Sequence, residues 1–373
     1  MRFSGGCGRR FAWRGSRWTW TVIAASFAAM GGLWWAGAHV VVPYWSGPRV
    51  ITVGPSGSGP DAVAISPDGK TLYAADGDCV SPGRVTSVNL ATGQAGKHID
   101  LGRGVWNLAI TPDGRTLYAL VSDCRSAAAK IVPVTIATGR AGSPLRFPYG
   151  VTDMAVSPDG ATLYVLASTS ARSMAVAPVG VASGDEGKAI PVPADSQALA
   201  ISPDSRTLYV GAGDPRDHRA DEVVPVDTAS GRVGTPVPMP DNVTGLAFAP
   251  DGSALYATGD DTYCPDPDGD HCASGPYSLT AVDVAAGTAG KPLRLSAPAM
   301  GIAAAPDGRT IYILNEDNTI TPVSTVTGGA GRPIATAAPL SDDGDADFVI
   351  APGGHAIYVA DQFQGVVVIP LAS

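Results

Sequence analysis

Residues 64–75 read AISPDGKTLYAA, and the chain contains seven versions of this stretch. The other copies start at residues 109, 155, 200, 247, 303 and 349. Successive copies are marked by prolines spaced 45, 46, 45, 47, 56 and 46 residues apart, namely Pro67, Pro112, Pro158, Pro203, Pro250, Pro306 and Pro352. A nearly fixed period of this length indicates one supersecondary unit that is repeated along the chain.

Each repeat predicts four short antiparallel strands. An apolar run, 61–66 in the first repeat, leads into a Pro-Asp-Gly turn, in which proline presets φ and glycine accepts a left-handed conformation. The run TLYAA follows, and two more runs lie at 84–90 and 97–101. Leu72 and Tyr73 point to opposite faces of the second strand, so each sheet is apolar on both faces and must pack between two similar sheets. Radial repetition of such sheets is typical of a β-propeller.

The two ends of the chain support a closed ring of seven blades. The last repeat ends after its third strand, at 365–371, and therefore lacks an outer strand. An unassigned strand-like run at 49–54 precedes the first repeat and fits that vacancy. Closure by both termini would remove the open sheet edge that an unclosed ring exposes. The sequence thus predicts an all-β, seven-bladed propeller of four-stranded blades over residues 43–373.

The repeated SPDG turn followed by a TLYVA-like strand resembles the YVTN-type repeats of bacterial seven-bladed propellers, over residues 49–371. Two copies depart from the pattern, because Ser205 replaces the turn glycine and the seventh copy reads Pro352-Gly353-Gly354. The resemblance implies a propeller fold. It implies no single function, since related propellers include lactonases, surface proteins and subunits of redox enzymes.

The N-terminal segment predicts delivery of the propeller outside the cytoplasm. Residues 1–17 contain five arginines and no acid, and residues 18–42 contain no Asp, Glu, Lys or Arg. Twenty-five such residues can cross a bilayer of about 30 Å as a helix, with the preceding arginines kept in the cytoplasm. We therefore expect a membrane-anchored protein with its N-terminus inside. The alternative is a secretory signal cleaved near residues 36–38, which would make the protein secreted.

Charge and cysteine content agree with that location. Without the N-terminal arginines, 20 basic and 34 acidic residues remain, a net charge of −14, so nucleic acid is a poor partner. Cys7 precedes the apolar span, and four cysteines follow it, an even number that suits an oxidising compartment. Four cysteines allow three pairings. We expect disulfides that join Cys79 to Cys124 and Cys264 to Cys272, because the other pairings would have to reach across the ring.

Candidate binding residues lie in the loops expected at one mouth of the central channel, because rigid scaffolds usually carry function on loops. The connections between blades supply Asp61, Trp106, Asn107, Asp153, Gln197, Asn242 and Asp347. The one lengthened loop, in the fifth blade, alternates Asp266, Asp268 and Asp270, a spacing that could hold calcium. A solvated acidic loop is the simpler interpretation of these aspartates.

The sequence favours a non-catalytic function. It contains no Cys/His zinc pattern, nucleophile elbow or phosphate-binding glycine loop. We therefore expect a monomeric, extracytoplasmic binding module for a protein, glycan or small molecule. The alternative is a lactonase-like hydrolase, for which Asp61, Asn107, Asp153 and Asp347 would have to converge at the channel mouth.

Overall fold

The structure is a computed structural model. It describes residues 49–53, 59–76, 82–122, 128–170, 173–214, 217–261, 275–336, 346–363 and 365–371. The regular structure in these ranges consists of strands, and none of their segments is a helix long and apolar enough to span a bilayer. The predicted helix at 18–42 lies outside the described residues.

The strands form seven antiparallel sheets, which confirms the predicted blades. Blade 1 contains β2 (Ala62–Ile65), β3 (Thr71–Asp76), β4 (Pro82–Asn89) and β5 (Gln94–Arg103). Blade 2 contains β6 (Val105–Ile110), β7 (Thr116–Ser122), β8 (Ala129–Thr135), β9 (Arg140–Ala141) and β10 (Leu145–Phe147). Blade 3 contains β11 (Val151–Val156), β12 (Thr162–Ser170), β13 (Ser173–Gly180) and β14 (Ile190–Val192). Two short strands share the outer position of blade 2, and the same holds for blade 5.

The remaining blades follow the same order. Blade 4 contains β15 (Ser196–Ile201), β16 (Thr207–Asp214), β17 (Asp217–Asp227) and β18 (Val237–Pro238). Blade 5 contains β19 (Asn242–Phe248), β20 (Ala254–Asp260), β21 (Tyr277–Asp283), β22 (Thr288–Ala289) and β23 (Leu293–Leu295). Blade 6 contains β24 (Ala299–Ala304), β25 (Thr310–Asn315), β26 (Thr319–Ser324) and β27 (Ile334–Ala335). Blade 7 contains β28 (Phe348–Ile350), β29 (Ala356–Asp361), β30 (Gly365–Pro370) and, as its outer strand, β1 (Arg49–Ile51).

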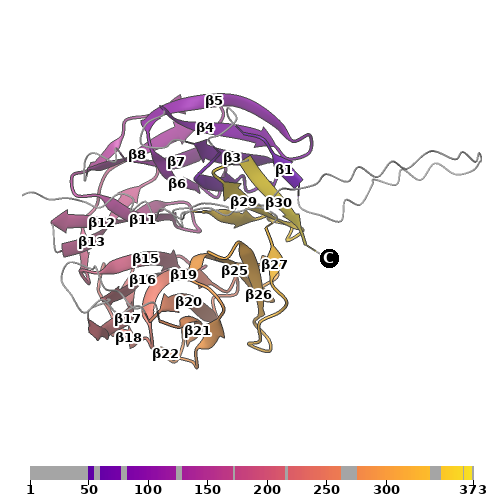
Figure 1. The fold of residues 1–373 in the computed structure, drawn as a ribbon. Coiled ribbons are helices and arrows are strands. Elements are labelled where there is room, and N and C mark those ends of the chain that lie inside the picture. Colours follow the sequence, from indigo (N-terminus) through magenta and orange to yellow (C-terminus); the bar gives the residue numbers. More distant parts are fainter. Residues whose placement is uncertain are drawn as a thin grey trace, which may run out of the picture. The chain divides into compact units, whose positions relative to one another are not determined.

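The ring closes as predicted, by a strand from each end of the chain. β1 pairs antiparallel with β30, and Ile51 lies opposite Val366. Figure 1 shows the two strands side by side, although they are far apart in the sequence. The first strands of the blades also contact one another in a closed circuit, from β2 through β6, β11, β15, β19 and β24 to β28 and back to β2. These seven strands therefore line the channel.

The hydrophobic core lies between the blades. Leu72 belongs to the cluster shared by blades 7 and 1, whereas Tyr73 belongs to the cluster shared by blades 1 and 2. Both side chains are buried. Alternate residues of one strand thus serve two neighbouring interfaces, which is why the repeat is apolar on both faces.

The repeated turn explains why the sequence motif is so regular. In the first copy the Gly69 N–H donates to the Ser66 carbonyl at 2.8 Å. The Asp68 carboxylate accepts from the Ser66 hydroxyl at 2.6 Å and from the Lys70 N–H at 3.1 Å. Gly69 has a φ of 67°, a left-handed conformation that glycine adopts without steric cost. Ser or Thr at the first position, proline, aspartate and glycine thus each contribute to the turn, although the last three copies have alanine at the first position.

Ser205 keeps this turn without glycine. Its φ is 62°, and its hydroxyl accepts a hydrogen bond of 3.0 Å from the Asp159 N–H of the preceding blade. We expect Ser205→Ala to lower the free energy of unfolding by about 1 kcal/mol, because the hydrogen bond is lost and the left-handed strain stays. Ser205→Gly should be nearly neutral, since relief of strain offsets the lost bond. Urea unfolding of both variants tests this, and equal stability of the two would contradict it.

Candidate functional site

The register of the strands defines two faces of the ring. Ala62 lies opposite Ala75, Asp76 opposite Arg84, and Pro82 opposite Arg103, so these residues share one end of blade 1. That end carries the connections between second and third strands and those between successive blades, and we call it the loop face. The Pro-Asp-Gly turns lie at the other end, which we call the turn face.

Asp153 joins the inner strands of blades 3 and 4. One carboxylate oxygen accepts from the Met154 N–H at 2.8 Å, and the other accepts from the Leu199 N–H on β15 at 2.9 Å. The inner strand of each blade has an unpaired edge that faces the channel, so its outward N–H groups need other acceptors. Asp153 supplies such an acceptor across the interface between the two blades.

Asp347 repeats this arrangement between blades 7 and 1. One carboxylate oxygen accepts from the Phe348 N–H at 2.7 Å, and the other accepts from the Val63 N–H on β2 at 3.0 Å. The Asp347 carbonyl also accepts from the Ala360 N–H at 2.8 Å. The same aspartate geometry thus occurs twice in the ring, in blades that are not neighbours.

Both aspartates occupy one position of the repeat, five residues before the marker proline. The seven residues at that position are Ala62, Asn107, Asp153, Ala198, Gly245, Gly301 and Asp347. Four of them are alanine or glycine, so the polar side chains at this position of the repeat are Asn107 and the two aspartates. This tier is the centre of the candidate site.

Enclosure by protein raises the pKa of both carboxyl groups. Burial raises the pKa of Asp153 to about 6, and the negative charge of Asp347 acts in the same direction. Burial likewise raises the pKa of Asp347 to about 6. The backbone N–H donors act against burial, because they favour the ionised carboxylate. Carboxyl groups of this kind can exchange protons near neutral pH.

Gln197 and Asn242, which the sequence suggested separately, form one hydrogen-bonded chain at the loop face. The Gln197 side-chain amide donates to Asn242 Oδ1 at 3.3 Å, and the Asn242 amide donates to Asp260 Oδ1 at 3.3 Å. Asn242 is buried, whereas Gln197 is exposed. Asp260, which was not among the residues expected at the channel mouth, ends β20 and joins these two through its cross-strand pairing with Asn242.

Gly213 makes room for this chain. A Cβ at residue 213 would lie 2.1 Å from Asn242 Oδ1 and 2.7 Å from Asp221 Oδ1. We expect Gly213→Ala to lower the free energy of unfolding by about 2–3 kcal/mol, because Asn242 would have to move. Gly329→Ala is the matched control, since the closest atom to its added Cβ lies 3.5 Å away. Urea unfolding of the two variants should differ clearly, and equal stability would contradict the close packing.

The remaining candidates belong to blades 1 and 2. Asp61 accepts a 2.8 Å hydrogen bond from the Gln362 side chain, which comes from the loop of blade 7. Trp106 packs against the apolar cluster between blades 2 and 3. Asn107 is half-buried on β6. Asp153 and Asp347 interact through their charges, since the charge of Asp347 raises the pKa of Asp153.

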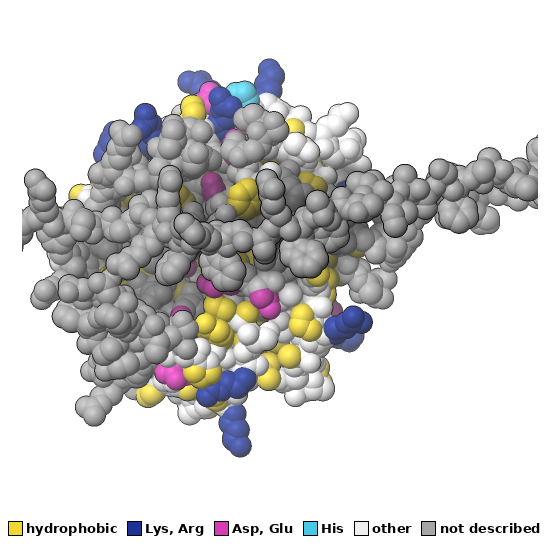
Figure 2. Space-filling model, viewed as in Figure 1, with side chains coloured by type: hydrophobic (Ala, Val, Ile, Leu, Met, Phe, Trp, Pro, Cys, Tyr) yellow, Lys and Arg dark blue, Asp and Glu magenta, His cyan; other side chains and the backbone are white. Residues whose placement is uncertain are grey.

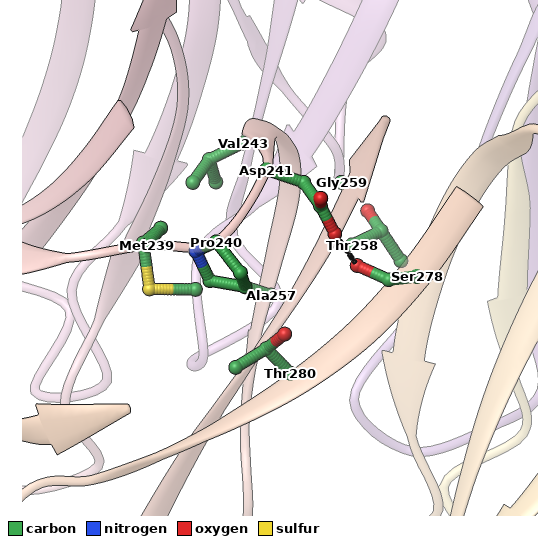
Figure 3. A pocket seen from close by; sticks show the side chains of 9 residues that line it. All are labelled: Met239, Pro240, Asp241, Val243, Ala257, Thr258, Gly259, Ser278 and Thr280. Carbon is green, nitrogen blue, oxygen red and sulfur yellow. Dashed lines mark hydrogen bonds between the residues drawn. The ribbon is translucent and has the colours of Figure 1, made fainter. Parts of the chain in front are cut away.

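A small polar pocket lies between blades 4 and 5 (Figure 3). The Ser278 hydroxyl donates to the Asp241 carboxylate, and both side chains are buried. Figure 3 shows Met239, Pro240 and Thr280, which also line the pocket, to one side of this pair. The space leaves no room for a water molecule. The two side chains therefore satisfy each other's hydrogen-bonding needs beneath the connection from blade 4 to blade 5, and the pocket offers no ligand site.

The predicted calcium loop and disulfides lie outside the described residues. This applies to Asp266, Asp268 and Asp270, and equally to Cys79, Cys124, Cys264 and Cys272. Within the described ranges, no three His, Cys, Asp or Glu side chains come together in a way that could hold a metal ion. Within these ranges the candidate site consists of the carboxyl groups of Asp153 and Asp347 and of the hydrogen-bonded chain of Gln197, Asn242 and Asp260.

Comparison with known proteins finds no matching family model and no matching curated protein. Among solved structures, a chain of hydrazine synthase from Kuenenia stuttgartiensis is similar, with a TM-score of 0.70 and 21% sequence identity. The alignment covers 86% of this chain and 97% of that chain. At this identity the likeness concerns the fold alone. Blade count, topology and this likeness agree that the protein is a seven-bladed β-propeller.

Proposed function

We propose that the protein is a membrane-anchored propeller outside the cytoplasm, which binds a ligand or partner through its loop face. In this proposal residues 1–17 are cytoplasmic, 18–42 form the anchor and 43–373 form the binding domain. The YVTN-type repeat resemblance and the even number of cysteines after the apolar span support this location. The cysteine pairs 79–124 and 264–272 would then brace loops on the binding face.

The observation that carries the proposal is the tier formed by Asp153 and Asp347. Each carboxylate is fixed by two backbone N–H groups, so its position is set before any ligand arrives. Four of the other blades have alanine or glycine at this position of the repeat, so they add no polar side chain to it. A channel mouth with acidic side chains held in place suits a ligand or partner that is cationic or rich in hydroxyl groups. Examples are a basic protein surface, an amine or a glycan.

Site-specific crosslinking in intact cells would test the face that binds. A photo-reactive amino acid replaces Tyr149 or Phe363, which are 52% and 48% exposed and lie in loop-face connections. The control replaces Val326, which is 82% exposed and lies in a turn-face connection. Crosslinks to one discrete species from residues 149 and 363, and not from 326, are expected. Crosslinks from residue 326 alone would contradict the proposal.

One observation favours the hydrolase alternative as a second candidate. A carboxyl group with a pKa of about 6, as in Asp153 and Asp347, can act as a general base near neutral pH. A lactonase-like enzyme would then open a sugar lactone at the channel mouth. Hydrolysis of gluconolactone by the protein, abolished in Asp153→Ala, would support this alternative. A rate equal to the uncatalysed one would remove it.

A further inference from the structure

The outer strand of blade 1 differs from those of the other blades. β5 spans ten residues, Gln94–Arg103. Among the described residues, the outer strands of the other blades are two or three residues long, namely β1, β9, β10, β14, β18, β22, β23 and β27. Short outer strands are one way in which proteins avoid pairing with other chains. The outer strand of blade 1 is not shortened in this way, although its pairing with β4 has two register shifts.

In four other blades the third strand carries a proline where its pairing with the outer strand is interrupted, whereas blades 1, 5 and 7 have Ser87, Ala281 and Val368 at this point. In blade 2 the Pro133 carbonyl accepts from the Gly142 N–H of the outer segment at 2.7 Å, so Pro133 turns its backbone toward the outer strand. Proline has no N–H, and the ladder with the outer strand breaks there. The equivalent residues in blades 3, 4 and 6 are also proline: Pro178, Pro225 and Pro322. Blade 1 has Ser87 opposite Tyr73, and β5 pairs with β4 on both sides of Ser87, with a register shift at that residue.

The edge formed by β5 is basic, in a protein that is acidic overall. Lys97 and Arg103 lie on β5 and are exposed. Lys130 is near, since a Cβ at residue 102 would lie 3.3 Å from its ammonium nitrogen. The acid on this strand, Asp100, is paired with Arg84 at 3.0 Å. Figure 2 shows Lys and Arg side chains gathered where Figure 1 places β5, at the upper edge of the view.

We infer that β5 is a docking edge that receives an extended acidic segment of another protein as an added strand. A partner strand would hydrogen-bond to the free edge of β5, and its acidic side chains would meet Lys97, Arg103 and Lys130. A second copy of this chain is disfavoured as the occupant, because two basic edges would repel each other. This surface lies on the rim of the ring and is separate from the Asp153 and Asp347 tier.

A binding measurement with a defined peptide tests the inference. The probe is a ten-residue peptide that alternates valine and glutamate, labelled with a fluorophore and titrated with the full-length protein in detergent. Its partner probe carries N-methyl groups on alternate residues, which remove the hydrogen-bond donors of one edge and keep the charge. We expect saturable binding of the first probe and at least about tenfold weaker binding of the second, because main-chain pairing supplies the affinity.

Charge reversal locates the site. Lys97→Glu combined with Arg103→Glu should weaken binding of the first probe by about tenfold, since two exposed charge pairs become repulsive. Arg232→Glu combined with Arg309→Glu is the control, because it changes net charge equally at exposed residues elsewhere. Hydrogen exchange should slow in residues 94–103 when the peptide is bound. Absence of binding, equal binding of the N-methylated probe, or equal weakening by both double variants would overturn the inference.

Discussion

Deletion of residues 49–53 should lower the free energy of unfolding by about 3–6 kcal/mol, because the burial of Ile51 and Val53 is worth about 1.5–3 kcal/mol each. Ile51 is 6% exposed and Val53 is 2% exposed, and both belong to the core between blades 7 and 1. The deletion would also leave β30 as an open edge, which favours aggregation. Urea unfolding and light scattering measure the two effects.

Val50→Ser provides the control for this deletion. Val50 lies on the same strand but is 42% exposed, so its side chain adds little to the core. We expect this variant to unfold like the parent protein and to stay monomeric. Ile51→Ala isolates the buried contact and should cost about 2–4 kcal/mol. A deletion variant with the parent's stability would mean that closure by β1 does not hold the ring together.

Closure was predictable because it depends on local signals that recur. The Pro-Asp-Gly turn sets each hairpin, and the apolar residues on both faces of TLYAA require neighbouring sheets on each side. The seventh repeat lacks an outer strand, and an unassigned strand precedes the first repeat. The simplest arrangement therefore pairs that strand with the seventh blade. The pairing of β1 with β30 confirms it.

The polar contacts were harder to predict, because they depend on the placement of different blades. Asp153 appears in the sequence as one acid among many, and its bond to the Leu199 N–H exists only because two inner strands lie side by side. Gln362 and Asp260 likewise gain their roles by meeting Asp61 and Asn242. The length of β5 depends on its pairing with β4 on both sides of Ser87, which only the strand register reveals.

The titration of Asp153 and Asp347 should be visible in the pH dependence of the free energy of unfolding. Each has a pKa of about 6 in the folded protein, above the ordinary value of 3.8. Between these values the folded protein holds protons that the unfolded chain has released, so the free energy of unfolding falls as the pH rises. A shift of this size corresponds to roughly 2–3 kcal/mol for each carboxyl group. Burial raises the pKa of Asp76 as well, which adds to the same trend.

The turn-face aspartates act in the opposite direction and in a lower pH range. Hydrogen bonds from Ser66 and from the Lys70 N–H lower the pKa of Asp68, and those from Ser253 lower that of Asp251. Their contribution is present above the ordinary pKa of 3.8 and is lost as the pH falls below it. The two groups of acids together place the maximum of stability on the acid side of neutrality, near pH 4–5.

Urea unfolding between pH 4.5 and 7.5 separates the two groups by mutation. The combined variant Asp153→Ala and Asp347→Ala should lose most of the fall in stability across this range, because the titrating groups are gone. Asp68→Ala combined with Asp251→Ala should keep that fall, since these exposed acids stay ionised throughout it. A parent protein whose stability is flat from pH 4.5 to 7.5 would contradict the enclosed carboxylates. If the variant without Asp153 and Asp347 keeps the parent's fall in stability with pH, other acids cause that fall. Asp76 would then be the first of them to test by mutation.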